Sequence, residues 1–503
     1  MVASPLLLTV SSALLYALSF PPFSFFPLVW IALVPFFLVA SMARPGSAAA
    51  YGILWGVMAA YGVCWWFPGL LAHYFGLSIV GAWAGFFAVG IGLAGVYFGA
   101  FAAWLSWLAR RQAANPLLLA AGWGACEFAR ANVLIGNPWA LSGYSQVACT
   151  RLIQLADATG PYGVGMLIAA VNACLAGLFT PALRSRRPTF SCIGVVTACG
   201  AALIYGEWRL SQTFTIGDPV TVTVIQGAVE RQNRRDPHPR ETRLQRYLTL
   251  TREASAAHPG LIFWPENAVD FPFQNSPESM AVLAVSRELG ADIILGGPHY
   301  GFGIADFYRY NSVFLVHGGK LVGRYDKLRL VPIAEGGQAG WLFPQRDSAY
   351  QPGRRLRVLQ AGAIPIGAFL CFEAMYPDLV RGFALQGAEV LANPSNDSWF
   401  GHAAPARHQL DIATVRAIEN RRYLIRPTAT GFSAVIDPYG RIVVRSGLDT
   451  PEVLTASIRS SRAQTPYQHW GDAAAWIAIV FTITASLYYQ LLQLTQHQKG
   501  GGP

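Results

Sequence analysis

Long apolar runs fill the chain up to about residue 210 and return once near its end, so the sequence excludes a fully water-soluble protein. A helix that crosses the hydrocarbon core of a bilayer needs about 20 mostly apolar residues. Charged residues make up 13% of the 503 residues, against about 25% in soluble domains, and the mean hydropathy is +0.35. The predicted spans are Pro5–Phe20, Phe26–Met42, Ala50–Leu71, Ile79–Leu108, Pro116–Ala131, Gly160–Leu178, Phe190–Glu207 and Ala473–Leu494.

The arginines between these spans predict the orientation, because cytoplasmic loops carry an excess of basic residues. Alternate loops contain Arg44, Arg110, Arg111, Arg184, Arg186 and Arg187. The loop that carries Arg130 and Arg151 is expected to face outward, against this trend. The pattern predicts a cytoplasmic N-terminus, a membrane domain of about seven helices at 1–210, an outward-facing domain at 215–465 and a last transmembrane helix at 470–495.

Between residues 215 and 460, short β-branched runs alternate with helical patterns. Gly318-Gly319 and Asp437–Gly440 each separate two such runs, which is typical of a hairpin. The predicted strands are Val220–Gln226, Leu261–Trp264, Asp292–Leu295, Asn311–His317, Lys320–Tyr325, Ile364–Leu370, Val390–Ala392, Tyr423–Thr428, Ser433–Ile436 and Arg441–Val444. The predicted helices are Arg240–Ala256, Pro277–Leu289, Met375–Gln386 and Arg407–Asn420. This alternation predicts a layered α/β domain with a mixed sheet.

Cys371 is the only cysteine of this predicted domain, since the other six all precede residue 200. A lone thiol here cannot form a disulfide within the domain, and it gives too few ligands for a zinc site. It follows the apolar run Gly367–Leu370, and a carboxylate, Glu373, comes two residues later. Cys371 is therefore either a buried filler or a nucleophile.

Glu266 and Lys327 also follow strand-like runs, and sites in α/β sheets form at strand ends. Lys327 is one of three lysines beside 34 arginines, so an ammonium is retained where the chain otherwise uses guanidinium. The carboxylate is suited to take the thiol proton, the thiolate to attack a carbonyl carbon, and the ammonium to stabilise the oxyanion. Taken singly, the three residues have ordinary alternatives: a loop carboxylate, a surface amine and a packed thiol.

A glutamate, a lysine and a cysteine in this order resemble the triad of the nitrilase superfamily. Further motifs narrow the resemblance to bacterial apolipoprotein N-acyltransferases. These motifs are Asn393–Gly401, Arg416–Arg422, Arg426–Gly431, Asn137-Pro138-Trp139, Gly143-Tyr144-Ser145-Gln146 and Gly160-Pro161-Tyr162-Gly163. The order of seven spans, an outward domain and one last span is also similar to that family.

The resemblance implies a multi-span α-helical membrane domain joined to a nitrilase-like αββα sandwich. It implies that an acyl chain moves from the sn-1 position of a phospholipid, typically phosphatidylethanolamine, to a thioester on Cys371. The α-amine of a diacylglyceryl-cysteine apolipoprotein would then accept the chain. The implied enzyme lies in the bacterial inner membrane, has its catalytic domain on the periplasmic side, and acts as a monomer without cofactor, metal or nucleic acid.

Further roles carry over from the family by position. Glu266 is the expected general base, Lys327 stabilises the oxyanion and the thiolate, and Cys371 is the nucleophile. Glu335 and Glu373 are expected to support this triad, and each has the alternative of an ordinary loop carboxylate. The expected substrate-binding residues are Phe372, Asn396, Trp399, Phe400, Trp139 and Tyr144. For Trp399 and Phe400, the alternative is an ordinary anchor in the membrane interface.

Three departures from the family pattern concern substrate preference. Phe372 replaces a tyrosine, Gly336-Gly337 follows Glu335, and Arg235 stands where a tryptophan is expected. A paralogue with another acyl donor or acceptor is therefore an alternative. Two further alternatives are a membrane-tethered amidase that passes the acyl group to water, and a non-catalytic protein of membrane assembly.

Overall fold

The chain divides into two compact units, which are described separately. The computed structural model describes residues 4–134, 136–183, 188–229, 240–302, 307–332, 334–336, 350–401 and 403–500. Unit 1 comprises Met1–Ser211 and Trp470–Pro503, and unit 2 comprises Gln212–His469. Arg235 and Gly337 lie outside the described residues, so the structure says nothing of those two departures.

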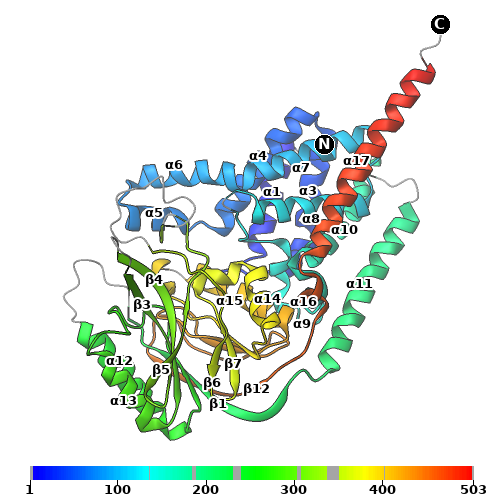
Figure 1. Cartoon of the computed structure of the whole chain (residues 1–503). Coiled ribbons are helices and arrows are strands. Elements are labelled where there is room, and N and C mark those ends of the chain that lie inside the picture. The colour runs from blue at the N-terminus through cyan, green and yellow to red at the C-terminus, as the bar shows by residue number, and fades with distance from the viewer. Residues whose placement is uncertain are drawn as a thin grey trace. The chain divides into compact units, whose positions relative to one another are not determined.

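Unit 1 is helical throughout its described parts (Figure 1). Its helices are α1 (Pro5–Leu18), α2 (Val29–Ala32), α3 (Val34–Met42), α4 (Pro45–Val63), α5 (Phe67–Phe75), α6 (Ile79–Gly90), α7 (Val96–Arg110), α8 (Pro116–Asn132), α9 (Thr150–Ile153), α10 (Ala156–Phe179), α11 (Pro188–Ser211) and α17 (Ala473–Gly500). Five described stretches are long and apolar enough to cross a membrane: Pro45–Val63, Ile79–Arg110, Ala156–Phe179, Phe190–Ser211 and Ala473–Thr495. The prediction of a multi-span helical membrane domain is confirmed.

The predicted span Ala50–Leu71 is wrong in its limits. α4 begins five residues earlier, at Pro45, and ends at Val63, and a separate helix, α5, follows. Cys64 leaves helical geometry with φ −109° and ψ 32°, and Pro68 lies in the first turn of α5. A proline suits a helix start because the first turn needs no N–H donor from it. The apolar run is therefore continuous in sequence although the helix is not.

Arg130, whose predicted place in an outward loop conflicted with the basic-residue rule, lies in α8 and is only 4% exposed. Its guanidinium donates hydrogen bonds to the carbonyl oxygens of Asn137 at 2.9 Å and Trp139 at 2.8 Å. One turn earlier, Glu127 accepts from the backbone N–H of Ser142 at 2.7 Å and from its hydroxyl at 2.9 Å. The two charged residues thus hold the segment that follows α8, rather than marking a compartment.

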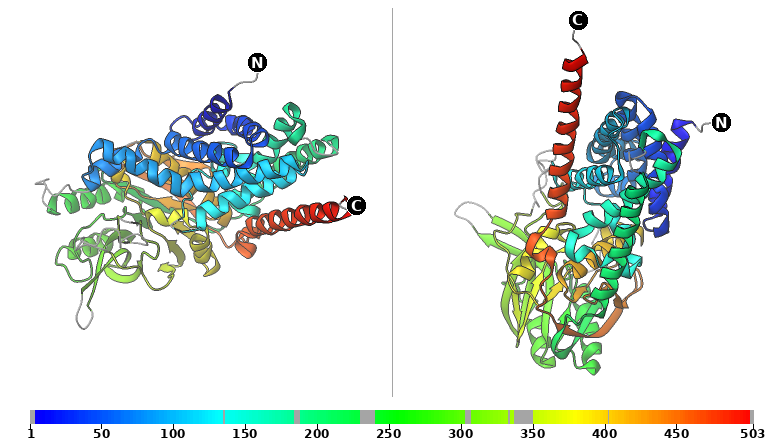
Figure 2. Two further views of the ribbon diagram at one scale, coloured as in Figure 1. Left: turned by 90° about the horizontal axis from the view of Figure 1, so that it is seen from above. Right: turned by 90° about the vertical axis from the view of Figure 1, so that its right-hand side faces the viewer.

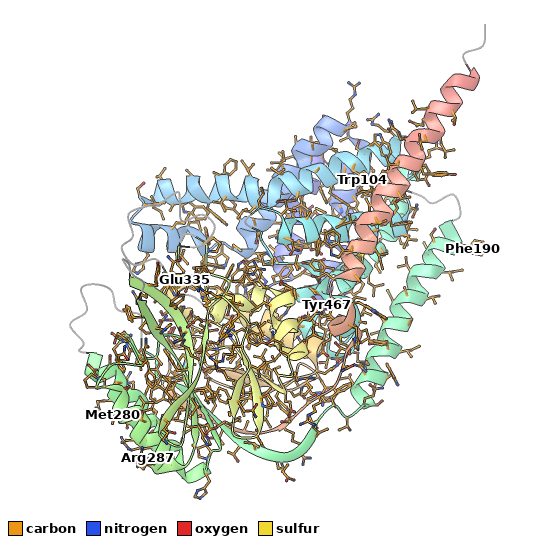
Figure 3. The ribbon with its side chains drawn as sticks, in the orientation of Figure 1. Trp104, Phe190, Met280, Arg287, Glu335 and Tyr467 are labelled. Carbon is orange, nitrogen blue, oxygen red and sulfur yellow. The ribbon has the colours of Figure 1, made fainter. Side chains whose placement is uncertain are left out.

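α11 and α17 are the most exposed of the five apolar stretches, since only 11% of the most apolar 18 residues of each are buried. Phe190, labelled in Figure 3, is 73% exposed at the start of α11. Trp104 of α7 donates its Nε1–H to Ser486 of α17 at 2.9 Å. Both views in Figure 2 show that the C-terminal part of α17 extends beyond the other helices of unit 1. A mostly apolar cavity of about 1420 Å³ lies between α8, α10, α11 and α17.

Unit 2 contains two six-stranded sheets flanked by helices (Figure 1). The strands are β1 (Ile216–Gln226), β2 (Leu261–Phe263), β3 (Asp292–Phe302), β4 (Phe307–His317), β5 (Lys320–Asp326), β6 (Leu359–Ala361), β7 (Ile364–Ala368), β8 (Val390–Ala392), β9 (Leu424–Arg426), β10 (Ala434–Ile436), β11 (Ile442–Arg445) and β12 (Glu452–Ser460). Their orders are β12-β1-β2-β3-β4-β5 and β11-β10-β9-β8-β7-β6. The α-helices are α12 (Arg240–Glu253), α13 (Ser279–Leu289), α14 (Pro377–Leu385), α15 (Ala403–Asn420) and the short α16 (Pro466–Trp470), whose last residue belongs to unit 1. The predicted αββα sandwich is confirmed.

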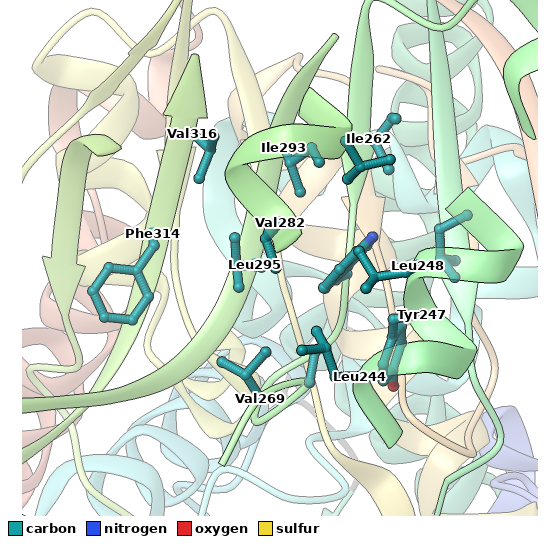
Figure 4. Close-up of a cluster of buried hydrophobic side chains, with 14 of the residues drawn as sticks. Leu244, Tyr247, Leu248, Ile262, Val269, Val282, Ile293, Leu295, Phe314 and Val316 are labelled. Atoms are coloured by element: carbon teal, nitrogen blue, oxygen red, sulfur yellow. The ribbon is translucent and has the colours of Figure 1, made fainter. Parts of the chain in front are cut away.

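The outer face of the first sheet is covered by α12 and α13 through one apolar cluster (Figure 4). Leu244 and Tyr247 of α12 and Val282 of α13 pack against Ile262 and Ile293 of the sheet, and all five are at most 5% exposed. Tyr247 also stacks on Trp264 with ring centroids 5.2 Å apart. Burial of this kind stabilises a fold by about 25 cal/mol per Å² of apolar surface, which fixes the strands whose ends carry the candidate site.

Strand direction explains how separate segments reach one edge. β1, β2 and β3 are parallel, β4 is antiparallel to β3, and β5 is antiparallel to β4. The C-terminal ends of β2, β3 and β5 therefore lie at the same edge of the first sheet. In the second sheet, β7, β8 and β9 are parallel, so their C-terminal ends also share an edge. Glu266 follows β2, Lys327 follows β5 and Cys371 follows β7.

Candidate active site

Lys327 lies at the centre of a buried cluster of charge in unit 2. Its Nζ is 3.2 Å from Glu266 Oε1 and 2.9 Å from Glu335 Oε2. The side chains of Lys327, Glu266 and Glu335 are 1%, 3% and 7% exposed. Burial alone lowers the pKa of a lysine, but the two carboxylates and Cys371 outweigh it and hold the pKa of Lys327 well above its usual value. The ammonium is therefore charged at neutral pH, and the structure brings together three residues that the sequence separates.

Glu266 is placed by a close crossing of two backbones. The N–H of Gly296 in β3 donates to the carbonyl of Pro265 at 3.1 Å. A Cβ at residue 296 would lie 2.5 Å from the Cα of Glu266 and 2.6 Å from the oxygen of Pro265. A side chain at residue 296 would thus push the glutamate segment away. Asn267 then turns the chain with φ +54°, so that the segment leaves the sheet directly after the carboxylate.

Asn311 of β4 joins the two carboxylates, and the sequence did not reveal it. Its Nδ2 donates to Glu266 Oε1 at 2.7 Å and to Glu335 Oε1 at 2.8 Å. Asn311 is fully buried, and its carbonyl accepts from the backbone N–H of Lys327 at 2.8 Å. The only sequence signal is a polar residue at the start of an otherwise apolar run. Asn311 contacts all three members of the charged cluster, so it orients them with one side chain and one peptide group.

Cys371 lies at a tight turn after β7. Its φ is +46°, in the left-handed region that costs a non-glycine residue about 1–2 kcal/mol. Its N–H donates to the carbonyl of Pro394 at 2.9 Å, and the 3₁₀ helix Cys371–Met375 starts at this residue. The thiol is 7% exposed. The conformation turns the chain sharply at the thiol, which resembles the strained turns that present nucleophiles in other α/β enzymes.

The electrostatic surroundings of Cys371 favour the neutral thiol. Burial raises the pKa of Cys371, the charge of Glu266 raises it further, and the charges of Lys327 and Arg426 lower it only in part. The group therefore rests as a thiol at neutral pH rather than as a preformed thiolate. Because Glu266 and Lys327 act electrostatically on the thiol, the carboxylate, the ammonium and the sulfur share one environment. A base would have to take this proton for the sulfur to act as a nucleophile.

Glu373 connects the two segments that carry Lys327 and Cys371. Its Oε1 accepts from the N–H of Leu328 at 2.7 Å, from the N–H of Arg329 at 3.0 Å and from Tyr325 Oη at 2.7 Å. Its Oε2 accepts from the N–H of Leu370 at 2.7 Å. Burial raises the pKa of Glu373, while these donors and the Lys327 charge oppose the rise. Glu373 is fully buried, so it acts on the backbone of both segments rather than on a substrate.

The six residues expected to bind substrate are divided between the units. Phe372 is half-buried with its ring on Tyr376, the centroids being 5.6 Å apart, and Trp399 and Phe400 are also half-buried. Asn396 is 3% exposed, and its Oδ1 accepts from the Ser398 hydroxyl at 2.7 Å. Trp139 and Tyr144 belong to unit 1. Tyr144 is only 2% exposed, whereas Trp139 is half-buried against Trp66, with centroids 5.7 Å apart.

Comparisons with known proteins cover almost the whole chain. A family model described as carbon-nitrogen hydrolase matches residues 221–467, and one described as apolipoprotein N-acyltransferase N-terminal domain matches residues 12–174. Apolipoprotein N-acyltransferase of Geobacter metallireducens is 31% identical over 492 residues, which is 94% of this chain and 93% of that protein. The protein of the same name from Methylococcus capsulatus is 31% identical over 497 residues, again 94% and 93%.

More distant similarity extends to solved structures. A variant of an amidase of the nitrilase superfamily from Nesterenkonia is 18% identical, with a TM-score of 0.41, and covers 52% of this chain and 98% of its own. A nitrilase-superfamily member from Saccharomyces cerevisiae is 20% identical, with a TM-score of 0.38, over 50% of this chain and 93% of its own.

Proposed function

This chain belongs to the apolipoprotein N-acyltransferase family and is a membrane-bound acyltransferase, and we propose that it moves an acyl chain from a phospholipid to a lipoprotein through a thioester on Cys371. The observation that carries the proposal is the buried ammonium of Lys327 between Glu266 and Glu335, in the electrostatic environment of a neutral thiol. The donor is the sn-1 ester of phosphatidylethanolamine. The acceptor is the α-amine of a diacylglyceryl-cysteine apolipoprotein.

In the first half-reaction, Glu266 takes the proton of the Cys371 thiol as the sulfur attacks the ester carbonyl carbon. The electron pair of the C=O bond moves to oxygen, and the oxyanion is stabilised by the ammonium of Lys327. The tetrahedral intermediate collapses, the C–O bond to the glycerol oxygen breaks, and that oxygen takes the proton from Glu266. The products are a lysophospholipid and the acyl thioester of Cys371.

In the second half-reaction, the lipoprotein amine attacks the thioester carbonyl carbon. Glu266 accepts a proton from the amine, Lys327 again stabilises the oxyanion, and the C–S bond breaks. The sulfur takes the proton back from Glu266 and the thiol is restored. The two half-reactions together replace one difficult acyl transfer by two easier ones. They follow ping-pong kinetics, because the lysophospholipid leaves before the lipoprotein amine reacts.

Glu335 and Glu373 have supporting roles in this scheme. Glu335 accepts from Lys327 at 2.9 Å and from the N–H of Val331 at 2.8 Å, so it orients the ammonium. Glu373 keeps the backbone beside Lys327 next to the backbone of Cys371. With both supports in place, Lys327 and Cys371 need little reorganisation when charge develops on the substrate oxygen.

The substrates carry acyl chains, which explains why the enzyme has a membrane domain. We propose that 1–210 and 470–495 span the inner membrane and that 215–465 lies on its periplasmic side, as the arginines of alternate loops indicate. Cysteine-accessibility labelling in intact cells tests this orientation. A single cysteine introduced at Lys320, in the hairpin between β4 and β5, should react with a membrane-impermeant maleimide in the periplasm. Labelling that requires disruption of the inner membrane contradicts the orientation.

Intact-mass measurement of the purified full chain tests the chemistry. After incubation with phosphatidylethanolamine, the protein should gain the mass of one acyl chain, and hydroxylamine should remove it. Cys371→Ala should fold and show no adduct, because exchanging a thiol for hydrogen at a 7% exposed position is a small change. Addition of a diacylglyceryl-cysteine peptide should discharge the adduct onto the peptide amine. Absence of an adduct on the wild-type chain contradicts the proposal.

The same experiment distinguishes the amidase alternative. An amidase uses the same three residues but passes the acyl group to water, so its adduct decays without a peptide acceptor and small amides are turned over. A thioester that persists for hours without the peptide, and is discharged within minutes by it, supports the transferase. Phospholipids with another headgroup or another acyl chain can replace the donor in this assay. They test whether this protein is a paralogue that prefers a different acyl donor.

A further inference from the structure

A buried amide side chain contacts the backbone on both sides of the candidate nucleophile. Asn393, directly after β8, donates from Nδ2 to the carbonyl oxygen of Phe369 at 3.0 Å and to that of Cys371 at 3.3 Å. Its own backbone N–H donates to Ile425 of the neighbouring strand at 2.8 Å. Asn393 is fully buried. One side chain thus fixes two peptide groups of the turn in which Cys371 has its left-handed conformation.

Arg426, in β9, sets the orientation of that amide. Its NH1 group donates to Asn393 Oδ1, and the guanidinium is fully buried. Because arginine has only donors, the oxygen of Asn393 must face Arg426. The nitrogen of the same amide must then face the carbonyls of Phe369 and Cys371. The hydrogen bond from Arg426 therefore orients the Asn393 amide so that its nitrogen faces the turn at Cys371.

The guanidinium is itself fixed on both of its terminal nitrogens. NH1 also donates to Ser395 Oγ at 2.8 Å, and NH2 donates to Asp397 Oδ1 at 3.1 Å and to Gln409 Oε1 at 2.8 Å. Ser395, Asp397 and Gln409 are at most 4% exposed. The planar fork matches several acceptors at fixed angles, which a single ammonium cannot do. The positive charge of Arg426 is paired with the carboxylate of Asp397 at 3.1 Å, so these two side chains together carry no net charge.

We propose that Arg426 and Asn393 are positioning residues for Cys371: the guanidinium orients the amide, and the amide holds the strained turn that presents the thiol. This inference rests on the proposed function only in taking Cys371 as the nucleophile. The two residues belong to the second sheet, on β9 and directly after β8, whereas the Lys327 cluster is at the end of the first sheet. The charge of Arg426 also acts on Cys371, but the role proposed here is carried by the hydrogen bonds that position the turn.

The test compares two variants that leave the formal charge unchanged. Asn393→Leu removes the donor with a side chain of similar shape, and Arg426→Lys keeps the charge but removes the fork. The first readout is the rate at which a small alkylating reagent, iodoacetamide, modifies Cys371 in the folded full chain, followed on the Cys371 peptide by mass spectrometry. Both variants should react more slowly than wild type, by roughly 10- to 100-fold, because the neutral thiol reacts only where Glu266 can take its proton, and a displaced sulfur loses that base. Wild-type or faster rates in both variants overturn the proposal, as does a wild-type Cys371 that does not react at all.

The matched control is Asn420→Leu, the same exchange at another fully buried asparagine of unit 2. Asn420 ends α15, and its Nδ2 donates to the carbonyl of Arg416 in the same helix at 2.9 Å rather than to the turn at Cys371. This control should alkylate at the wild-type rate, so equal slowing in Asn420→Leu and Asn393→Leu assigns the effect to general loosening and overturns the proposal. If Asn393→Leu does not fold, Arg426→Lys alone decides the result.

A second readout separates positioning from substrate binding. In the phosphatidylethanolamine assay, both variants should lower the maximal rate of acyl-enzyme formation by a similar factor, with the half-saturating phospholipid concentration unchanged. A change confined to half-saturation overturns the positioning role. If the wild-type chain forms no acyl-enzyme while the alkylation differences persist, the proposed function fails and the positioning of Cys371 stands.

Discussion

Each unit contains a buried cluster of charged side chains, and the two clusters use their hydrogen bonds differently. In unit 1, Glu127 accepts from the N–H and the hydroxyl of Ser142, and Arg130 donates to backbone carbonyls of the segment after α8. In unit 2, Lys327 donates to Glu266 and Glu335, both carboxylates also accept from Asn311, and Glu335 accepts from the N–H of Val331 as well. The first cluster is directed at one loop, and the second mainly at its own charged members.

Under the proposed mechanism, this difference distinguishes a structural cluster in unit 1 from a reactive one in unit 2. Charges whose hydrogen bonds go mainly to one segment, as those of Glu127 and Arg130 do, fix that segment. In the proposed mechanism, Glu266, one of the two carboxylates around Lys327, takes the proton of the buried thiol. The comparison predicts that substitutions in the Lys327 cluster affect chemistry most, and that substitutions at Glu127 affect stability only.

The largest effect is expected for Lys327→Arg. The side chain is 1% exposed between two carboxylates, so a larger guanidinium displaces one of them and its fork cannot reproduce a compact ammonium. We expect acyl-enzyme formation to fall on the order of 10³-fold, as when an oxyanion-stabilising donor is removed. Lys327→Ala should lie within about tenfold of this value. Rates close to wild type in Lys327→Arg, measured by intact mass over time, contradict the role of Lys327.

The pH dependence adds a condition to this prediction. The pKa of Lys327 is raised above its usual value by Glu266 and Glu335. Its contribution to stability is therefore complete below the unfolded-state pKa and is lost only as the pH rises through the higher folded-state pKa. The wild-type rate should show no loss from deprotonation of this lysine up to about pH 9, given the usual lysine pKa of about 10.4. A fall in rate between pH 7 and 9 that Lys327→Arg abolishes contradicts this assignment.

Asn311→Ala should have the next largest effect. The variant removes the donor shared by Glu266 and Glu335, leaving two carboxylates to separate around Lys327. The maximal rate of acyl transfer should fall on the order of 10²-fold, as expected when catalytic groups are misplaced by about 1 Å. Half-saturation by phospholipid should not change. A loss confined to half-saturation indicates that Asn311 binds substrate instead.

Asn311 also shows what the sequence could and could not predict about the site. Glu266, Lys327 and Cys371 could be selected because each follows an apolar run and two of them are rare residue types in this chain. Asn311 begins a predicted strand, where a polar residue is usually solvent-exposed. Only the antiparallel return of β4 beside β5, and the proximity of Glu335, turn that position inward. Long-range register determines this, and a local pattern does not contain it.

The fold was predictable to a similar degree. Helices α12, α13, α14 and α15 and ten of the twelve strands were expected, because hydrophobic periodicity and turn residues are local signals. β12 was missed because only two of its residues, Ala456 and Ile458, are buried, and because its partner β1 lies at the other end of unit 2. β6 has only three residues, Leu359–Ala361, which gives too little pattern to recognise.

A third prediction concerns a carboxylate of unit 2 outside the Lys327 cluster. Asp411 of α15 is 8% exposed, and burial raises its pKa to about 6, although Arg407 opposes the rise with a hydrogen bond at 3.1 Å. Since the folded state binds this proton more tightly than the unfolded state, Asp411 lowers stability progressively as the pH rises from about 4 to about 6, by up to about 3 kcal/mol. Asp411→Asn should therefore raise the apparent Tm by several degrees at pH 7.5 and much less at pH 4.5. Equal shifts at both pH values contradict the prediction.

The smallest effect is expected for Glu127→Gln in unit 1. The amide oxygen can still accept from the N–H of Ser142, and the serine hydroxyl can rotate to accept from the new amide nitrogen, so the geometry of the loop is retained. What is lost is the electrostatic attraction between the carboxylate and Arg130, so the stability should fall only slightly. The apparent Tm should drop by a few degrees, while iodoacetamide should modify Cys371 at the wild-type rate. Slower alkylation of Cys371 in Glu127→Gln, with Tm unchanged, would mean that the unit 1 cluster acts on the chemistry and that the distinction between the two clusters is wrong.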